Sequence, residues 1–285
     1  MAAPVFSAEV ITAPTQHNAQ ATILKAGNDQ AEKLLVFPVA GILETRLMAR
    51  GHFKMMKHWL GQPGVIVERP FAHPGLGLIR SVEDGYEVFE RFMNRKLEQH
   101  DPKTPYLMVG HSYGGVDISR YHAEHGEQRP GSQAVAIGSP LGDMRRLPFR
   151  PRIFGAIDPY KNRCGEIADF VHDTNDLLNA TGQQESLTVA GSTIDQMVPL
   201  IGSVPLNMNA QKVVFSQFGG TPKNYRHVPA IAAPLIEHWG MPMHPSVLNY
   251  LGSIATAIIR SDQPYDDSFT PDRAQYGAVY TPATA

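Results

Sequence analysis

The sequence predicts an α/β protein with a doubly wound, mostly parallel sheet and helices on both faces of that sheet. Short β-branched apolar runs alternate along the chain with amphipathic stretches of helical length. Most of these runs are apolar throughout, as strands are when helices cover both sides of a parallel sheet. The chain has 285 residues, of which 42% are hydrophobic and 18% charged, so it can bury a full core in a single domain.

The expected elements follow one another in strand–helix order. The predicted strands are Ala21–Ala26, Lys33–Val39, Gly64–Glu68, Tyr106–Gly110, Ala134–Gly138, Ser186–Ala190 and Lys212–Phe218. The predicted helices are Leu47–Leu60, Val82–Leu97, Val116–His125, Glu166–Leu178 and Pro245–Ile259. This alternation is typical of right-handed βαβ units.

Residues 1–285 are expected to form one domain with one insertion and a tail. After the run that ends near Ser139, roughly 45 residues precede the next predicted strand, which is longer than an ordinary crossover. We expect a small lid at about 142–182; a long surface connection without a role at the site is the alternative. The segment from about 261 to 285 is rich in Pro, Asp and Thr and is expected to lie along the surface as a tail.

Charge and composition argue against several classes of partner. The formal net charge of -2 predicts no nucleic-acid partner, and no apolar run approaches the ~20 residues of an integral membrane segment. The single cysteine, Cys164, excludes an internal disulfide. The N-terminus lacks a basic stretch followed by an apolar one, so we expect no secretory signal and a cytoplasmic location. Oligomeric state has no signature in the sequence.

The strongest chemical signal is the turn Gly110-His111-Ser112-Tyr113-Gly114, with a second glycine at position 115. It lies between an apolar strand and a predicted helix. A serine at the tip of so sharp a turn takes a strained backbone conformation, and side chains two residues before and after it would collide. The helix that follows directs its N-terminus at the hydroxyl and favours negative charge there. The pattern therefore predicts Ser112 as a nucleophile, rather than a glycine-rich turn that only begins a helix.

With this turn, the chain resembles the α/β-hydrolases, and within them the lipase and esterase members. The element Gly138-Ser139-Pro140 after the next strand is similar to one that lipases carry behind the nucleophile helix. The resemblance extends in order from about Lys33 to Ile259. It implies the α/β-hydrolase fold and a triad in the order serine, acid, histidine.

The acid is expected after a late strand. Asp195 follows the apolar run that begins at Ser186 and precedes Val198-Pro199, which looks like the acid loop of the family. A carboxylate there would hold the imidazole in the right tautomer. Asp143, just beyond the preceding strand, is the competing acid, and a helix-capping role is the structural alternative for Asp195.

Three histidines follow the last predicted strand: His227, His238 and His244. We select His227 as the base because it comes first after the strand. His244 precedes Pro245 and suits the start of the last helix, and His238 lies beside Trp239 in an apolar stretch that suits a core histidine.

Two backbone amides should form the oxyanion hole. In this fold Tyr113 supplies one of them, and the loop after the early strand supplies the other. Lipases often have His-Gly in that loop, where this chain has Ala40-Gly41. We therefore nominate Ile42 as the second donor, with Gly41 as the alternative.

The sequence thus predicts a serine carboxylic-ester hydrolase that acts on a small-molecule or lipid-like ester through an acyl-enzyme. An acyltransferase, a thioesterase or amidase with the same triad, and a non-catalytic binding module on this fold remain alternatives. No cofactor or metal is expected. His122 and His125 have no third ligand at a recognisable spacing, and the chain has neither a dinucleotide fingerprint nor a Walker lysine.

Overall fold

The computed structural model describes residues 31–41, 44, 46–74, 81–142, 158–192, 195, 198, 200–203, 205, 208, 210–215, 238–259 and 279–280. Within these ranges a seven-stranded sheet has the order β2-β1-β3-β4-β5-β6-β7. Its strands are β1 (Leu34–Val39), β2 (Val65–Val67), β3 (Tyr106–His111), β4 (Gln133–Ile137), β5 (Leu187–Ser192), β6 (Gln211–Phe215) and β7 (Val279–Tyr280). All neighbours pair in parallel except β6 and β7. The predicted strand at 21–26 lies outside the described residues.

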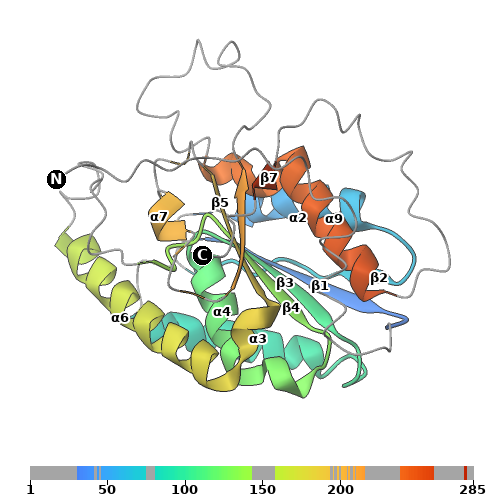
Figure 1. The fold of residues 1–285 in the computed structure, drawn as a ribbon, viewed down its shortest axis with the longest axis horizontal. Helices are drawn as coiled ribbons and strands as arrows, with labels where there is room; N and C mark the ends of the chain where they lie inside the picture. Colours follow the sequence, from blue (N-terminus) through green and yellow to red (C-terminus); the bar gives the residue numbers. More distant parts are fainter. Residues whose placement is uncertain are drawn as a thin grey trace, which may run out of the picture.

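Helices cover both faces of this sheet, as the sequence predicts (Figure 1). The main helices are α2 (Arg46–Leu60), α3 (Val82–Leu97), α4 (Tyr113–His125), α6 (Asp158–Thr181) and α9 (Pro245–Ile258). Short elements are η2 (Gly126–Gln128), η4 (Gln183–Ser186), α7 (Leu200–Ser203) and η6 (Met241–Met243). One core cluster joins the sheet to α3, α4 and α6, and a second joins its other face to α2 and α9. The doubly wound prediction is confirmed.

Alternate side chains of the central strands divide between the two cores. On β3, Tyr106 and Met108 pack toward α3 and α4, whereas Leu107 and Val109 pack toward α2 and α9. All four are buried, which is why the run reads as apolar throughout. The pleat of a buried parallel strand thus accounts for the pattern seen in the sequence.

α6 occupies the second half of the segment predicted as a lid. Its residues Phe170, Val171 and Leu178 belong to the core cluster of α3 and α4, so α6 is the crossover helix between β4 and β5. Residues 143–157, between β4 and α6, lie outside the described residues, and a lid there stays a prediction. In the predicted tail, Val279–Tyr280 pairs antiparallel with β6.

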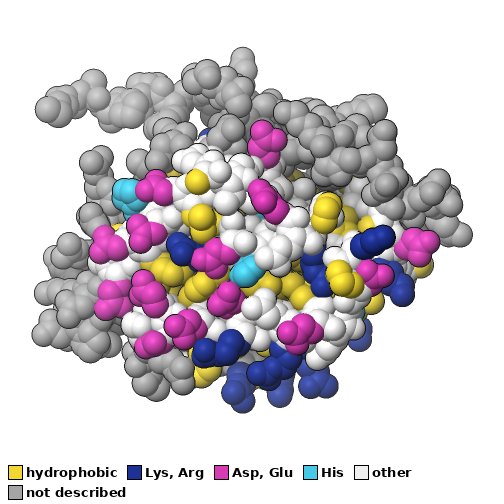
Figure 2. Space-filling view, turned by 90° about the horizontal axis from the view of Figure 1, so that it is seen from below, with side chains coloured by type: hydrophobic (Ala, Val, Ile, Leu, Met, Phe, Trp, Pro, Cys, Tyr) yellow, Lys and Arg dark blue, Asp and Glu magenta, His cyan; other side chains and the backbone are white. Residues whose placement is uncertain are grey.

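The face formed by α3, α4 and α6 is mixed in charge. Figure 2 shows acidic side chains spread over this face and basic side chains gathered along one border. In the described part of the chain, no helix has the length and hydrophobicity to cross a membrane.

Candidate active site

The turn between β3 and α4 has the strained geometry that its sequence predicts. Ser112 has φ 52° and ψ -126°, and within the described ranges it is the only residue other than glycine with a positive φ. A Cβ atom at Gly110 would lie 2.4 Å from the carbonyl oxygen of Gly114, and one at Gly114 would lie 2.6 Å from that of Val39. Glycine is therefore required on both sides of the serine. Backbone strain of this kind is characteristic of functional sites.

Ser112 lies at the carboxyl edge of the sheet, beside the ends of β1 and β4. Its amide donates to the carbonyl oxygen of Ile137, the last residue of β4, at 2.9 Å. A Cβ atom at Gly41, just after β1, would lie 2.7 Å from Cβ and 3.3 Å from Oγ of Ser112. Tyr113 is the first residue of α4, whose first-turn amides point beyond the helix end.

Strand order and the strained serine together decide the architecture. Six parallel strands run β2-β1-β3-β4-β5-β6, and the serine stands in a sharp turn between β3 and the helix that follows it. A serine in such a turn, at the carboxyl edge of the sheet, is characteristic of one fold. The fold is that of the α/β-hydrolases.

In this α/β-hydrolase fold, Asp195 follows β5 and contacts a histidine. Its Oδ2 lies 2.8 Å from Nδ1 of His238, 43 residues further along the chain, and its Oδ1 accepts a hydrogen bond from the amide of Val198 at 3.1 Å. The side chains of Asp195 and His238 are 1% and 3% exposed. A carboxylate accepts hydrogen bonds and cannot donate them, so Nδ1 of His238 carries the proton and Nε2 keeps the lone pair.

The ring of His238 packs on His111, next to the turn that carries Ser112. Its centroid is 4.6 Å from that of His111, the residue before Ser112. The pKa of His238 is lowered by burial and by His111, against the opposing effects of Asp195 and Glu44. His238 is therefore a neutral ring at neutral pH, as a proton acceptor must be.

Some of the predicted site residues lie within the described part of the chain and others lie outside it. Ser112, Tyr113 and Asp195 lie at the carboxyl edge of the sheet, while His227, Ile42 and the competing acid Asp143 lie outside the described residues. His244 directly precedes the last helix, α9, and its carbonyl oxygen accepts from the amide of Leu248 at 3.0 Å. That is the helix-start position which its place before Pro245 indicates.

The apolar sequence around His238 predicts a core histidine. The residue is indeed buried, but its partner is a carboxylate from a different strand end. Spacing alone does not distinguish His238 from the two other histidines. Glu44 and the ring of His111, which also lie at this edge of the sheet, carry no sequence signal at all.

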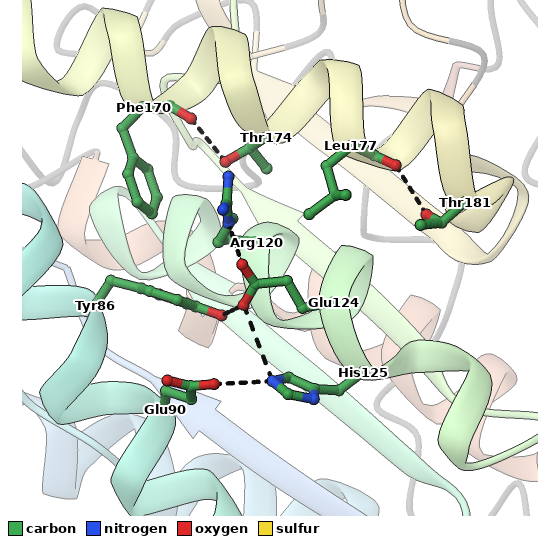
Figure 3. Close-up of polar contacts among 9 residues, drawn as sticks. All are labelled: Tyr86, Glu90, Arg120, Glu124, His125, Phe170, Thr174, Leu177 and Thr181. Atoms are coloured by element: carbon green, nitrogen blue, oxygen red, sulfur yellow. Dashed lines mark hydrogen bonds and ion pairs between the residues drawn. The ribbon is translucent and has the colours of Figure 1, made fainter.

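A second group of ionisable residues joins α3 to α4, away from the serine (Figure 3). Glu90, Glu124 and His125 bring possible ligand atoms within 4.8 Å of one another. The carboxylates already have protein partners, however: Tyr86 and Arg120 bind Glu124, and His125 lies 3.0 Å from Glu90. We interpret this group as a joint between helices.

The chain was also compared with known proteins. No family model matches the chain, and no curated protein matches it. A monoacylglycerol lipase from Paleococcus ferrophilus is 14% identical with a TM-score of 0.47, covering 78% of this chain and 94% of the lipase. Est1E from Butyrivibrio proteoclasticus is 13% identical with a TM-score of 0.46, covering 66% and 80%. An alpha/beta hydrolase superfamily protein from Enterococcus faecalis is 11% identical with a TM-score of 0.40, covering 74% and 90%. Similarity at this level says nothing about substrate.

Proposed function

We propose that the protein is a serine hydrolase of carboxylic esters, in which Ser112 is the nucleophile, His238 the base and Asp195 the acid that orients it. The observation that carries the proposal is the buried Asp195–His238 pair, which packs on His111, the residue before a serine in a strained strand-to-helix turn. A histidine with a purely structural role could also be the partner of Asp195. Such a role would not explain why Ser112 is held in a strained backbone conformation. We assign His238 as the base in place of His227, which chain order alone favours, because the contact of His238 with Asp195 supports that role.

The first half of the reaction forms an acyl-enzyme. Nε2 of His238 takes the proton of the Ser112 hydroxyl as Oγ attacks the ester carbonyl carbon. The carbonyl oxygen becomes an oxyanion, which the amide of Tyr113 and one from the loop after β1, Ile42 or Gly41, would stabilise. When the intermediate collapses, the C–O bond to the alcohol breaks, and the alcohol leaves with the proton from His238.

The second half repeats these steps with water. His238 takes a proton from water, the resulting hydroxide attacks the acyl carbonyl, and the Ser112 ester bond breaks. Ser112 recovers its proton from His238, and the carboxylic acid leaves. The Nδ1–H to Asp195 contact fixes the tautomer of His238, so that Nε2 can accept and return the proton in both halves.

Covalent labelling and hydrolysis together test the proposal. We expect a fluorophosphonate probe to label the wild-type protein and Ser253→Ala, a control in which a hydroxyl bound to the Asn249 carbonyl oxygen is removed. Ser112→Ala should not label, and it should hydrolyse esters at least about 10³-fold more slowly with an unchanged circular dichroism spectrum. A p-nitrophenyl ester series from acetate to palmitate measures turnover and acyl preference.

Two results would contradict the proposal. Full ester turnover by Ser112→Ala would show that Ser112 is not the nucleophile. A wild-type protein that neither labels nor hydrolyses any ester would behave as a binding module. Transfer of the acyl group to an added alcohol at the expense of hydrolysis would instead identify an acyltransferase.

A further inference from the structure

Glu44 is a buried carboxylate that the reaction above does not use. Its side chain is fully buried, with Oε1 hydrogen-bonded to Nδ1 of His111 and Oε2 3.5 Å from Nδ1 of His52. Burial acts to raise the pKa of Glu44, but His111 and His52 outweigh it and hold the pKa below its usual range. Glu44 is therefore ionised, and Nδ1 of His111 must be the donor. Burying a charge costs free energy even when the charge is paired, so the burial of the Glu44 carboxylate needs an explanation.

Glu44 comes shortly after β1, which ends at Val39. Its amide lies 3.4 Å from the carbonyl oxygen of Gly41, and Gly41 packs directly on Ser112. His111 is the residue before Ser112. The Glu44–His111 hydrogen bond therefore joins the chain just after Gly41 to the last residue of β3, and both Gly41 and His111 lie next to Ser112.

The same residues also contact His238 and its neighbour. The ring of His111 lies 4.6 Å from the ring of His238, and Nε2 of His52 lies 3.2 Å from the carbonyl oxygen of Trp239. The His111 and His52 rings are 6.0 Å apart at an interplanar angle of 88°. His238 is thus held by Asp195 at Nδ1, by His111 across its ring and by His52 through the next peptide.

We propose that Glu44, acting through His111, is a positioning residue that fixes the loop after β1 and the ring of His238 relative to Ser112. The inference rests on the proposed function, because it assigns a role beside that same serine and histidine. Glu44 also supplies a second negative charge near His238, in addition to Asp195. The ionisable groups that face His238 are Asp195 after β5, His111 on β3 and Glu44 after β1, with His52 of α2 behind them.

Geometry and charge are separated by two substitutions at position 44. Glu44→Ala removes the acceptor for His111, so kcat should fall by about tenfold or more while KM stays within about twofold. Glu44→Gln keeps an acceptor oxygen but removes the charge, so kcat should stay within about threefold. Without that anion the pKa of His238 falls, so the acid limb of the kcat/KM profile should move about half a unit to lower pH.

Two further variants keep the test independent of folding. His111→Asn offers a side-chain N–H to Glu44 and should retain more activity than His111→Ala. Glu68→Gln is the control: Glu68 also binds a histidine, with Oε1 3.1 Å from Nε2 of His100, and its removal should leave the pH profile unchanged. Near-UV circular dichroism checks the fold of each variant.

The outcomes distinguish a failure of this inference from a failure of the proposed function. If wild type neither labels nor hydrolyses esters, the proposed function fails. If wild type is active but Glu44→Ala keeps its kcat, or Glu44→Gln leaves the acid limb in place, the inference alone is overturned. A change confined to KM would also overturn it, because a positioning residue for the reacting groups acts on kcat.

Discussion

At the scale of single residues, the site combines groups with very different sequence signals. Ser112 is marked by glycines that no other residue could replace, and Asp195 by the apolar strand before it. His238 has no such mark, because three histidines follow β6 and its contact with Asp195 forms only in the folded chain. Glu44 and His111 have no sequence mark either, since their contact joins the end of β3 to a position 67 residues earlier in the chain.

The choice between His238 and His227 has a direct test. His238→Ala should lower kcat for ester hydrolysis by at least about 10³-fold, because Asp195 then has no imidazole to orient. His227→Ala should stay within about threefold of wild type. Turnover of both variants on p-nitrophenyl butyrate decides the matter, and the opposite ranking would restore the assignment drawn from chain order.

At the scale of elements, the sequence predicts the strands and helices well but places some of their ends wrongly. α4 begins at Tyr113 rather than Val116, because Gly114 and Gly115 argue against a helix that tertiary packing nonetheless requires. α6 begins at Asp158 rather than Glu166, with Pro159 in a first turn that tolerates proline. Local sequence propensity predicts where a helix or strand lies, and tertiary contacts with distant strands determine where it begins and ends.

Gly115 shows how tightly α4 packs on the sheet. A Cβ atom there would lie 1.7 Å from Oγ and 2.5 Å from Cβ of Ser139. We expect Gly115→Ala to lower the free energy of unfolding by about 1–3 kcal/mol, measured in urea. In a Ser139→Gly background this cost should fall by at least about 1 kcal/mol.

The control for this cycle is Gly51→Ala in α2, where an added Cβ atom meets nothing within 4 Å. There alanine should raise the free energy of unfolding by about 0.5–1 kcal/mol. Equal costs for Gly115→Ala in both backgrounds would show that Ser139 is not the obstacle.

At the scale of the whole molecule, buried neutral histidines make stability depend on pH. Burial lowers the pKa of His122 from 6.5 to about 4 and that of His244 to about 4, and it also lowers the pKa values of His52 and His238. Each folded pKa lies below the unfolded value, so the stability is complete above about pH 6.5 and is lost as pH falls toward 4. The lowered pKa of Glu44 extends that loss below pH 4.5, whereas the raised pKa of Asp117 acts in the opposite sense.

His122 offers the cleanest measurement of this effect. Its ring accepts from the hydroxyl of Tyr106 at 3.2 Å and contacts Oγ of Ser186 at 2.7 Å, so the neutral form is satisfied. A shift from 6.5 to about 4 corresponds to roughly 3 kcal/mol of stability lost between those pH values. Urea unfolding at pH 7, 5.5 and 4.5 should show a shallower decline for His122→Gln, and parallel curves would refute the assignment.

The order of the candidate site residues along the chain also has a consequence for protein synthesis. On the proposed assignment, the nucleophile follows β3 and the acid follows β5, but the histidine comes after β6, in the last fifth of the chain. A nascent chain that has emerged only as far as β6 therefore holds a strained serine and a carboxylate without a base between them. On the proposed assignment, ester cleavage begins only when residue 238 has left the ribosome and its segment has closed over the edge of the sheet.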